Sequence, residues 1–376
     1  MPRSIVVLAL ASLLAIAACK SKGKGMEAPE TLVPISESEA DAFAKKLETA
    51  LGQCDQGALA TMIDVDSMVR TAIIKSAVPA NQQQALEFDE AGLAEIRQRF
   101  CKKPDGQKSP TYLRWQERDH QQVLLFRFDL LGGLNYLEFR VGRNSQSKIK
   151  VDEAQIYSQQ RRMTEILRDA FDDLMKTPGS AALAKIQASD LEPAALLQKI
   201  ESMEPALRDS KIAQIAAVEA AASLDGAQYQ KAIDNYRALF PTDRSLDMNI
   251  ITGYGEQKNF SAALQTVDQL DRSLGGDPYL DRARIMLLLD EGKDLARATT
   301  LAETTVQASP ADKEAHYLLL EVHVEARNFP GAVAIMRLMG ERFELVFDEE
   351  GIDKSDAGYR ALLESPEWQA YSLRVE

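Results

Sequence analysis

The residues with the most definite chemistry in this sequence are its three cysteines, Cys19, Cys54 and Cys101. A thiol can be acylated, can form a disulfide with a second thiol, or can stay reduced as a small buried side chain. Cys19 follows an apolar stretch at the amino terminus, whereas Cys54 and Cys101 lie within the body of the chain. Their positions therefore suggest one chemistry for Cys19 and another for the remaining pair.

The first eighteen residues have the pattern of a secretory signal peptide. Arg3 supplies a positive charge, residues 5–16 are almost entirely apolar, and the small pair Ala17-Ala18 precedes Cys19. A charged start, a short apolar run and small residues mark a cleavage site. The run of about 12 residues is shorter than the ~20 that span a bilayer as a helix. We therefore expect residues 1–18 to be removed on export.

The quartet Ile16-Ala17-Ala18-Cys19 resembles the lipobox of bacterial lipoproteins, in which the cysteine receives a diacylglycerol before cleavage. Ile16 departs from the Leu that the consensus prefers, and the alternative is an ordinary signal peptide with a chance cysteine. The resemblance implies lipidation of Cys19 and anchoring in the bacterial cell envelope, since two acyl chains hold a protein stably. Lys20 favours, by family analogy, the outer membrane, with the body facing the periplasm or the cell surface. Residues 19–36 would then be the lipidated cysteine and a flexible tether.

Export also bears on Cys54 and Cys101. In an oxidising compartment an even pair of cysteines favours a disulfide. The alternative is two unpaired buried thiols, because spacing alone does not place the two Cα atoms. We expect the bond.

The bulk composition bounds the class of protein. The chain has 376 residues, a formal net charge of −13 and 45% hydrophobic residues. A body of this length suggests two domains. The acidic balance argues against a nucleic-acid partner, because nucleic-acid binding depends on clustered Lys and Arg, and it weakly favours basic partners.

Residues 37–175 are expected to form an α+β domain, with helices packed on an antiparallel sheet. Ser38-Glu39-Ala40-Asp41 has the spacing of a capping box, and Phe43, Leu47 and Leu51 follow it at helical intervals. Four short segments with period-two alternation then predict an antiparallel meander: 112–117, 122–129, 134–141 and 148–157. This order of helices and strands resembles the nuclear-transport-factor-two-like superfamily, which implies a cone whose concave face is filled by helices.

The second half of the chain is expected to be helical and contains a repeat. Lys258-Asn259-Phe260 precedes Ala263, Lys293-Asp294-Leu295 precedes Ala298, and Arg327-Asn328-Phe329 precedes Ala332, with a looser copy before Ala232. A period of about 34 residues is typical of helical hairpins. The alanine falls where the second helix of each pair crosses the first closely. The alternative is a helical bundle with coincidental spacing.

The repeat resembles the tetratricopeptide repeat (TPR). Tyr254 fits the family's aromatic place in the first helix, and the three alanines fit its small place in the second. Ile251, Met286 and Leu320 depart from the family, since a small residue is usual there. The resemblance implies an all-α TPR-like solenoid at residues 211–345, after a helical connector at 176–210 and before a C-terminal capping segment at 346–376.

Solenoids of this family bind polypeptide segments on the face lined by the first helices. The resemblance therefore implies an unidentified protein or peptide partner. The candidate contact residues are Asp247, Asn249, Tyr254, Arg282, His316 and Glu321.

No convincing catalytic or metal site is evident in the sequence, and no cofactor is expected. His316 and His323 lack the i, i+4 spacing of a helical zinc motif. A few charged residues would line a pocket if the first domain is a cone: Asp55, Asp64, Asp66, Arg97 and Arg127. Helix caps explain Asp64 and Asp66 equally well.

The sequence thus predicts a non-enzymatic, membrane-anchored scaffold that binds another polypeptide. One alternative is an enzyme or ligand carrier centred in the first domain; a core filled by Phe43, Leu47 and Phe126 would argue against it. The other alternative is a structural component of an envelope assembly.

Overall fold

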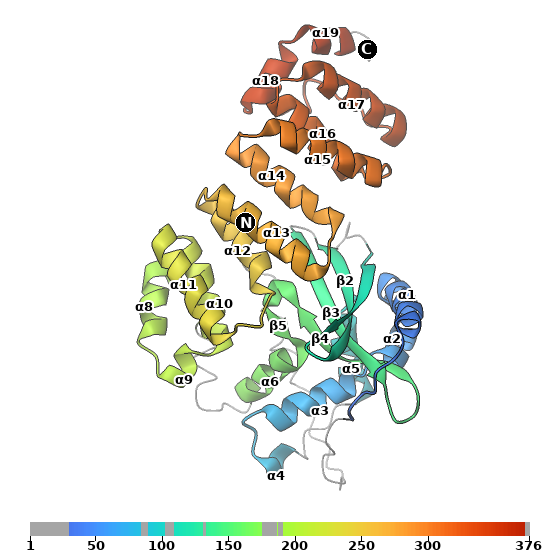
Figure 1. Ribbon diagram of the computed structural model, residues 1–376, viewed down its shortest axis with the longest axis vertical. Helices are drawn as coiled ribbons and strands as arrows, with labels where there is room; N and C mark the ends of the chain where they lie inside the picture. Colours follow the sequence, from blue (N-terminus) through green and yellow to red (C-terminus); the bar gives the residue numbers. More distant parts are fainter. Residues whose placement is uncertain are drawn as a thin grey trace. The chain divides into compact units, whose positions relative to one another are not determined.

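The computed structural model describes residues 30–83, 89–101, 109–130, 133–174, 186 and 191–372. The chain divides into two compact units, Met1–Asn249 and Ile250–Glu376. The first unit holds a sheet with packed helices and a further group of helices, and the second unit is helical where it is described (Figure 1). The expected order of an α+β part followed by a helical part is confirmed at this level.

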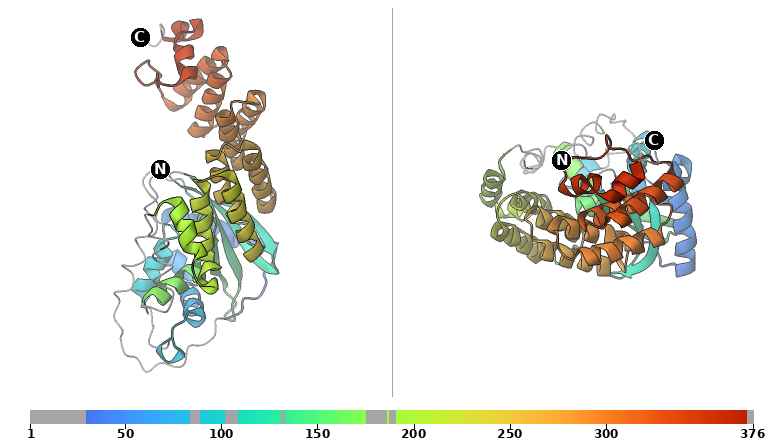
Figure 2. Two further views of the ribbon diagram at one scale, coloured as in Figure 1. Left: turned by 90° about the vertical axis from the view of Figure 1, so that its left-hand side faces the viewer. Right: turned by 90° about the horizontal axis from the view of Figure 1, so that it is seen from above.

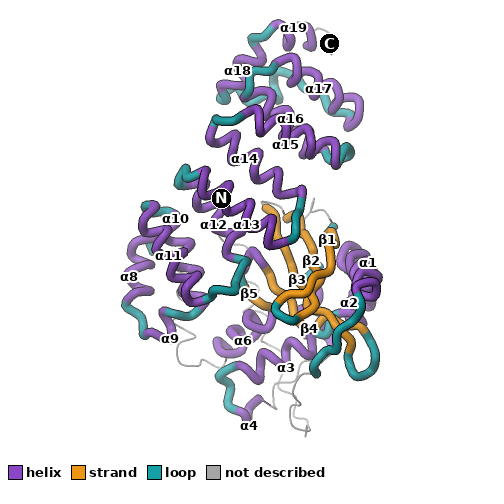
Figure 3. The backbone as a smooth tube through the Cα atoms, in the orientation of Figure 1, coloured by secondary structure: helices purple, strands orange, loops and turns teal. Residues whose placement is uncertain are grey.

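The sheet is an antiparallel meander with the strand order β1-β2-β3-β4-β5. Figure 3 shows its strands in orange. The strands are β1 (Thr111–Arg118), β2 (Gln121–Leu130), β3 (Gly133–Arg143), β4 (Ile149–Ile156) and β5 (Arg161–Arg162). The first four match the segments predicted from alternation, whereas the two-residue β5 was not predicted.

Alternation decides which side of the sheet faces the helices. Leu124 and Phe126 of β2 and Phe139 of β3 are fully buried in one hydrophobic core with the helices. The register pairs Leu124 with Phe139, so these side chains lie side by side on one face. The register shifts between Arg140 and Val141, where β4 carries one more residue than β3. This bulge bends the sheet locally.

Six helices accompany the sheet: α1 (Glu37–Gln53), α2 (Gln56–Met62), α3 (Val65–Lys75), α4 (Ala80–Gln83), α5 (Glu90–Gln98) and α6 (Met163–Leu174). Helix α1 contacts β1, while α2, α3 and α6 contact β4. The start of α1 corrects the sequence prediction. Ser36, not Ser38, is the cap, and its side chain and that of Glu39 form a reciprocal capping box. The Ser36 pairing places the larger Glu, rather than Asp41, at the reaching position.

The rest of the first unit is helical. It contains α8 (Pro193–Glu201), α9 (Pro205–Arg208), α10 (Lys211–Ala222) and α11 (Gly226–Leu239). Helix α10 contacts the other three. The loosest copy of the repeat, α10 with α11, therefore belongs to the same compact unit as the sheet. Of the expected connector 176–210, only residue 186 and residues 191–210 are described.

Helices follow in pairs from α12 onward, and Figure 2 shows α14 to α19 succeeding one another. The pairs are α12 (Leu246–Glu256) with α13 (Phe260–Leu274), α14 (Asp281–Glu291) with α15 (Leu295–Ala308), α16 (Lys313–Glu325) with α17 (Phe329–Phe343), and α18 (Ala357–Leu363) with α19 (Pro366–Ser372). We call the first helix of each pair helix A and the second helix B. Helix A of one pair contacts helix A of the next at α14–α16 and at α16–α18.

The repeated alanines are buried in these pairs. Ala263, Ala298 and Ala332 are each 0% exposed. They lie in the first turn of helix B, where a side chain beyond Cβ would push the two helices apart. The close packing of the two helices therefore explains why alanine recurs at this interval in the sequence.

The turn between helix A and helix B also repeats. Asn259, Asp294 and Asn328 each cap helix B, with the side-chain oxygen accepting a hydrogen bond from the N–H three residues on. Lys258 and Arg327, which precede the two asparagines, adopt positive φ. In each repeat, the first residue of the polar pair therefore follows the end of helix A, and the second caps the start of helix B.

Candidate functional site

Cys19, the residue with the firmest predicted role, lies outside the described residues, as do the signal peptide and most of the tether. In the part of the chain that the structure describes, no helix is both long enough and apolar enough to cross a membrane.

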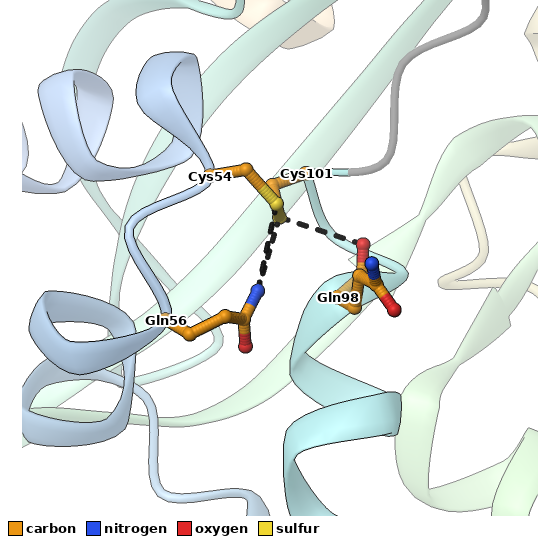
Figure 4. The surroundings of a disulfide bond; sticks show 4 residues. All are labelled: Cys54, Gln56, Gln98 and Cys101. Atoms are coloured by element: carbon orange, nitrogen blue, oxygen red, sulfur yellow. Dashed lines mark hydrogen bonds between the residues drawn. A yellow bond between two sulfur atoms is a disulfide. The ribbon is translucent and has the colours of Figure 1, made fainter.

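Cys54 and Cys101 are joined by a disulfide, with their Cα atoms 5.2 Å apart (Figure 4). Cys54 ends α1 in the left-handed conformation, and Cys101 follows α5. The Gln56 Nε2 atom lies 3.5 Å from each sulfur atom. The bond joins two cysteines that are 47 positions apart in the sequence, and it thereby ties the end of α1 to the end of α5.

Arg282, a candidate contact residue, is engaged within the second unit. Its guanidinium lies 4.1 Å from the centre of the Tyr279 ring and pairs with Asp312 and Glu314. Asp312 caps α16, so Arg282 on α14 fastens one helix A to the start of the next. Its side chain is only 11% exposed, which favours a packing role.

His316 and Tyr254 are also turned inward. His316 is fully buried; its Nδ1 atom lies 2.9 Å from the Asp312 carbonyl oxygen, and its ring packs edge-on against Phe343. Tyr254 is buried as well, and its carbonyl oxygen accepts the hydrogen bond of the Asn259 N–H. Neither side chain can contact a partner without rearrangement.

Asp247 and Asn249 belong to the first unit, whereas the other four candidates belong to the second. Asp247 pairs with Arg237 across 3.0 Å. Partial burial raises the pKa of Asp247 even though Arg237 opposes the shift. Asn249 is half-buried.

Glu321 is the exposed member of the set. Partial burial of its carboxyl group and the negative charge of Asp356 raise the pKa of Glu321. Tyr359 of α18 lies among the same carboxylates: its burial, Glu321, Asp356 and Glu325 all raise the pKa of its hydroxyl. Tyr317, one helical turn before Glu321, packs against Phe347.

We call these residues of α16, of α18 and of the α18 cap the acidic-aromatic face: Tyr317, Glu321, Glu325, Asp356 and Tyr359. The sequence reasoning found only Glu321. The spacing of Tyr317, Glu321 and Glu325 by four residues is a signal for a shared helix face. Asp356 and Tyr359 come from another helix and carry no such signal.

Four of the five charged residues considered for a pocket in the first domain are engaged in helix caps or ion pairs. Asp55 caps α2 and Asp64 caps α3. Asp66 pairs with Arg70 at 2.8 Å, and the buried Arg97 pairs with Glu90. These side chains therefore have partners within the chain, and their positions are explained without a bound ligand.

Two buried carboxylates of β4 have raised pKa values, a property that active sites share with structural pairs. Burial raises the pKa of Asp152, which makes a two-bond pair with Arg140. Burial also raises the pKa of Glu153, which accepts hydrogen bonds from the Thr164 hydroxyl and N–H. Glu153 thereby satisfies an N–H at the start of α6.

Apolar side chains occupy the space between the helices and the sheet. Phe43 and Leu47 of α1 and Phe126 of β2 are buried in one cluster. In the described ranges, no group of three or more His, Cys, Asp or Glu residues is arranged to hold a metal ion.

No protein-family model, no curated protein and no solved structure matched this chain.

Proposed function

We propose that this chain is a bacterial envelope lipoprotein, anchored through Cys19, whose second unit binds another polypeptide through TPR-like repeats. The observation that carries the proposal is the recurrence of one helix pair, with the same turn and the same buried alanine, from Asn259 to Ala332. Stacked pairs of this kind bury a shared core and present their A helices side by side as a continuous surface. The solenoid and its family membership are part of this proposal.

The acidic-aromatic face is the proposed contact surface. Glu321 is exposed, and among the described residues no salt bridge pairs it with a cationic side chain. Carboxylates beside tyrosine rings attract Lys and Arg side chains through charge and through the ring faces. We therefore propose a polypeptide partner with a basic segment. Arg282 on Tyr279, flanked by Asp312 and Glu314, shows the same chemistry inside this chain.

The α+β part would serve as a second docking surface, and its order of elements fits the nuclear-transport-factor-two-like superfamily. The apolar filling by Phe43, Leu47 and Phe126 supports a docking surface over a ligand pocket or an active site.

Crosslinking in the native cell, followed by identification of co-purified proteins, tests the proposal. Glu321→Lys reverses the charge of the face and should reduce the recovered partner about tenfold or more, as truncation of a central contact does. Glu341→Lys is the matched control, because Glu341 is exposed on helix B of the same pair. Recovery of monomer alone with crosslinkers of several lengths would contradict the proposal, as would equal recovery with both variants.

A further inference from the structure

Residues 30–36 form a short arm that leads into α1; it is the last part of the expected flexible tether 19–36, and it is bonded to the sheet instead of free. Val33 pairs with Arg143 of β3 in antiparallel fashion: each N–H donates to the other's carbonyl oxygen at 2.8 Å. Pro34 favours this geometry, because the residue before a proline is restricted to extended conformations. The arm is therefore paired as a strand although it is only a few residues long.

Side chains fasten the arm at two further points. The Gln122 amide accepts a hydrogen bond from the Ile35 N–H and donates one to the Ile35 carbonyl oxygen, both at 2.7 Å. Ile35 itself is buried in the core of the first unit. At the outer end, the Glu30 carboxylate accepts a hydrogen bond from the Ser145 N–H. The arm is thus held at its start, middle and end.

The sheet has a place built for the arm. The ladder between β2 and β3 reaches only Arg140, so β3 has no β2 partner at Arg143. At Gly142 an added Cβ would lie 2.7 Å from the Leu32 Cβ and 2.9 Å from the Val33 carbonyl oxygen. The arm can approach β3 this closely only because residue 142 lacks a side chain.

We infer that this arm is a strap that sets the reach of the membrane tether; the inference rests on the proposed lipid anchor at Cys19. With the strap closed, the number of residues from Cys19 to Glu30 limits the reach to at most about 40 Å, at ~3.6 Å per residue. With the strap open, the free chain runs to Ser36 and spans about 60 Å. Opening breaks the arm's own hydrogen bonds and withdraws Ile35 from the core, whereas the paired residues of β1 to β4 do not include the arm. The strap is a device that lengthens the tether by about half while the sheet stays paired.

The test uses the mature protein, purified from the membranes of a bacterial host that lipidates exported proteins, with liposomes that contain an acceptor-labelled lipid. A donor dye is placed at Thr61→Cys, an exposed position on α2. Gln122→Ala removes the side-chain fastening, and Gly142→Val fills the place of the arm. Gln121→Ala is the matched control, because Gln121 is an exposed neighbour of Gln122. Amide hydrogen exchange at Val33 and Arg143 reports closure of the strap, and energy transfer reports the distance from the bilayer.

We expect exchange at Val33 and Arg143 to be at least tenfold faster in Gln122→Ala and Gly142→Val than in the wild type and Gln121→Ala. Energy transfer should fall in the same two variants. Equal exchange in all four proteins would overturn the strap, and faster exchange with unchanged energy transfer would overturn its control of reach. Failure of the wild type to bind liposomes, with Val33 still protected, would overturn the lipid anchor and the control of reach while leaving the fastening of the arm established.

Discussion

Asn328 holds His323 at two points: its side-chain amide donates to the His323 Nδ1 atom at 3.1 Å, and its backbone N–H donates to the His323 carbonyl oxygen at 2.8 Å. The Asn328 side-chain oxygen accepts from the Gly331 N–H, which fixes the orientation of the amide. Nδ1 must therefore be unprotonated. The pair fastens the end of α16 to the start of α17.

This pair predicts acid sensitivity of the second unit. Burial lowers the pKa of His323 below its ordinary value of 6.5, with Glu303 partly opposing the shift. The folded state therefore binds fewer protons than the unfolded state, so the contribution to stability is complete above pH 6.5 and is lost as the pH falls through the folded pKa. Urea unfolding should show that the free energy of unfolding of the wild type is lower at pH 5.5 than at pH 7.5. His323→Gln keeps an acceptor and should lose this part of the pH dependence; an equal drop in both proteins would exclude His323 as the cause.

The disulfide predicts a sharp result in a thiol count. The denatured, unreduced mature protein should show no reactive thiol from Cys54 or Cys101, since the two are bonded. Cys54→Ala with Cys101→Ala should lower the free energy of unfolding of the first unit by about 2–4 kcal/mol, because the closed loop restricts the unfolded chain. Two reactive thiols in the unreduced protein would contradict the bond.

The ion pair between Asp243 and Lys211 is expected to contribute to the stability of the first unit. It lies between α11 and α12, pairs with Lys211 across 2.6 Å and accepts hydrogen bonds from the Tyr236 and Ser245 hydroxyls. Burial opposes its ionisation, yet Lys211 and these bonds outweigh burial and lower the pKa of Asp243. Asp243→Asn leaves Lys211 with only its longer, 3.7 Å contact to Glu165 and should cost about 3 kcal/mol.

Lys211→Met in the Asp243→Asn background is the matched test, because it removes the charge that has lost its closest partner. The double variant should recover part of the lost stability, measured by chemical unfolding. If it is less stable than Asp243→Asn alone by the full cost of a second independent substitution, the two residues do not act as a pair.

Helix α18 packs tightly on α16 at Gly358, so a larger residue there should be destabilising. An added Cβ would lie 2.8 Å from the Val324 Cγ1 atom and 3.0 Å from the Glu325 Oε1 atom. Gly358→Ala should therefore destabilise the second unit by about 1–3 kcal/mol through overpacking. Gly255→Ala is the control, since its Cβ would meet only Leu287 at an ordinary 3.6 Å. Equal thermal midpoints for the two variants would contradict the close packing.

The sequence pattern predicts the features that depend on neighbouring residues, namely the strands and the turns between helices. Alternation located β1 to β4, and the polar pair before each repeated alanine located the turns between helices A and B. The capping box at Ser36 was placed two residues late, because Ser38 and Asp41 have the same spacing as Ser36 and Glu39. Two competing caps differ only in how well the side chains reach, which spacing does not measure.

The contacts between helices could not be predicted from the sequence pattern. Arg282, His316 and Tyr254 were expected on a binding face because they occupy helix A positions, yet each packs inward. Their direction depends on the helix that follows, as the approach of Phe343 to His316 shows. Asp356 and Tyr359 join Glu321 only because α18 packs against α16.

Lipidation of Cys19 is the central claim, since the anchor, the compartment and the reach of the strap all follow from it. The decisive measurement is lipid labelling and membrane fractionation of the wild type beside Cys19→Ala in a bacterial host. The wild type should be labelled and sediment with membranes, and its mature chain should begin at Cys19. Cys19→Ala should be unlabelled and either released or left unprocessed. A Cys19→Ala protein that stays lipid-labelled and membrane-bound would contradict the account.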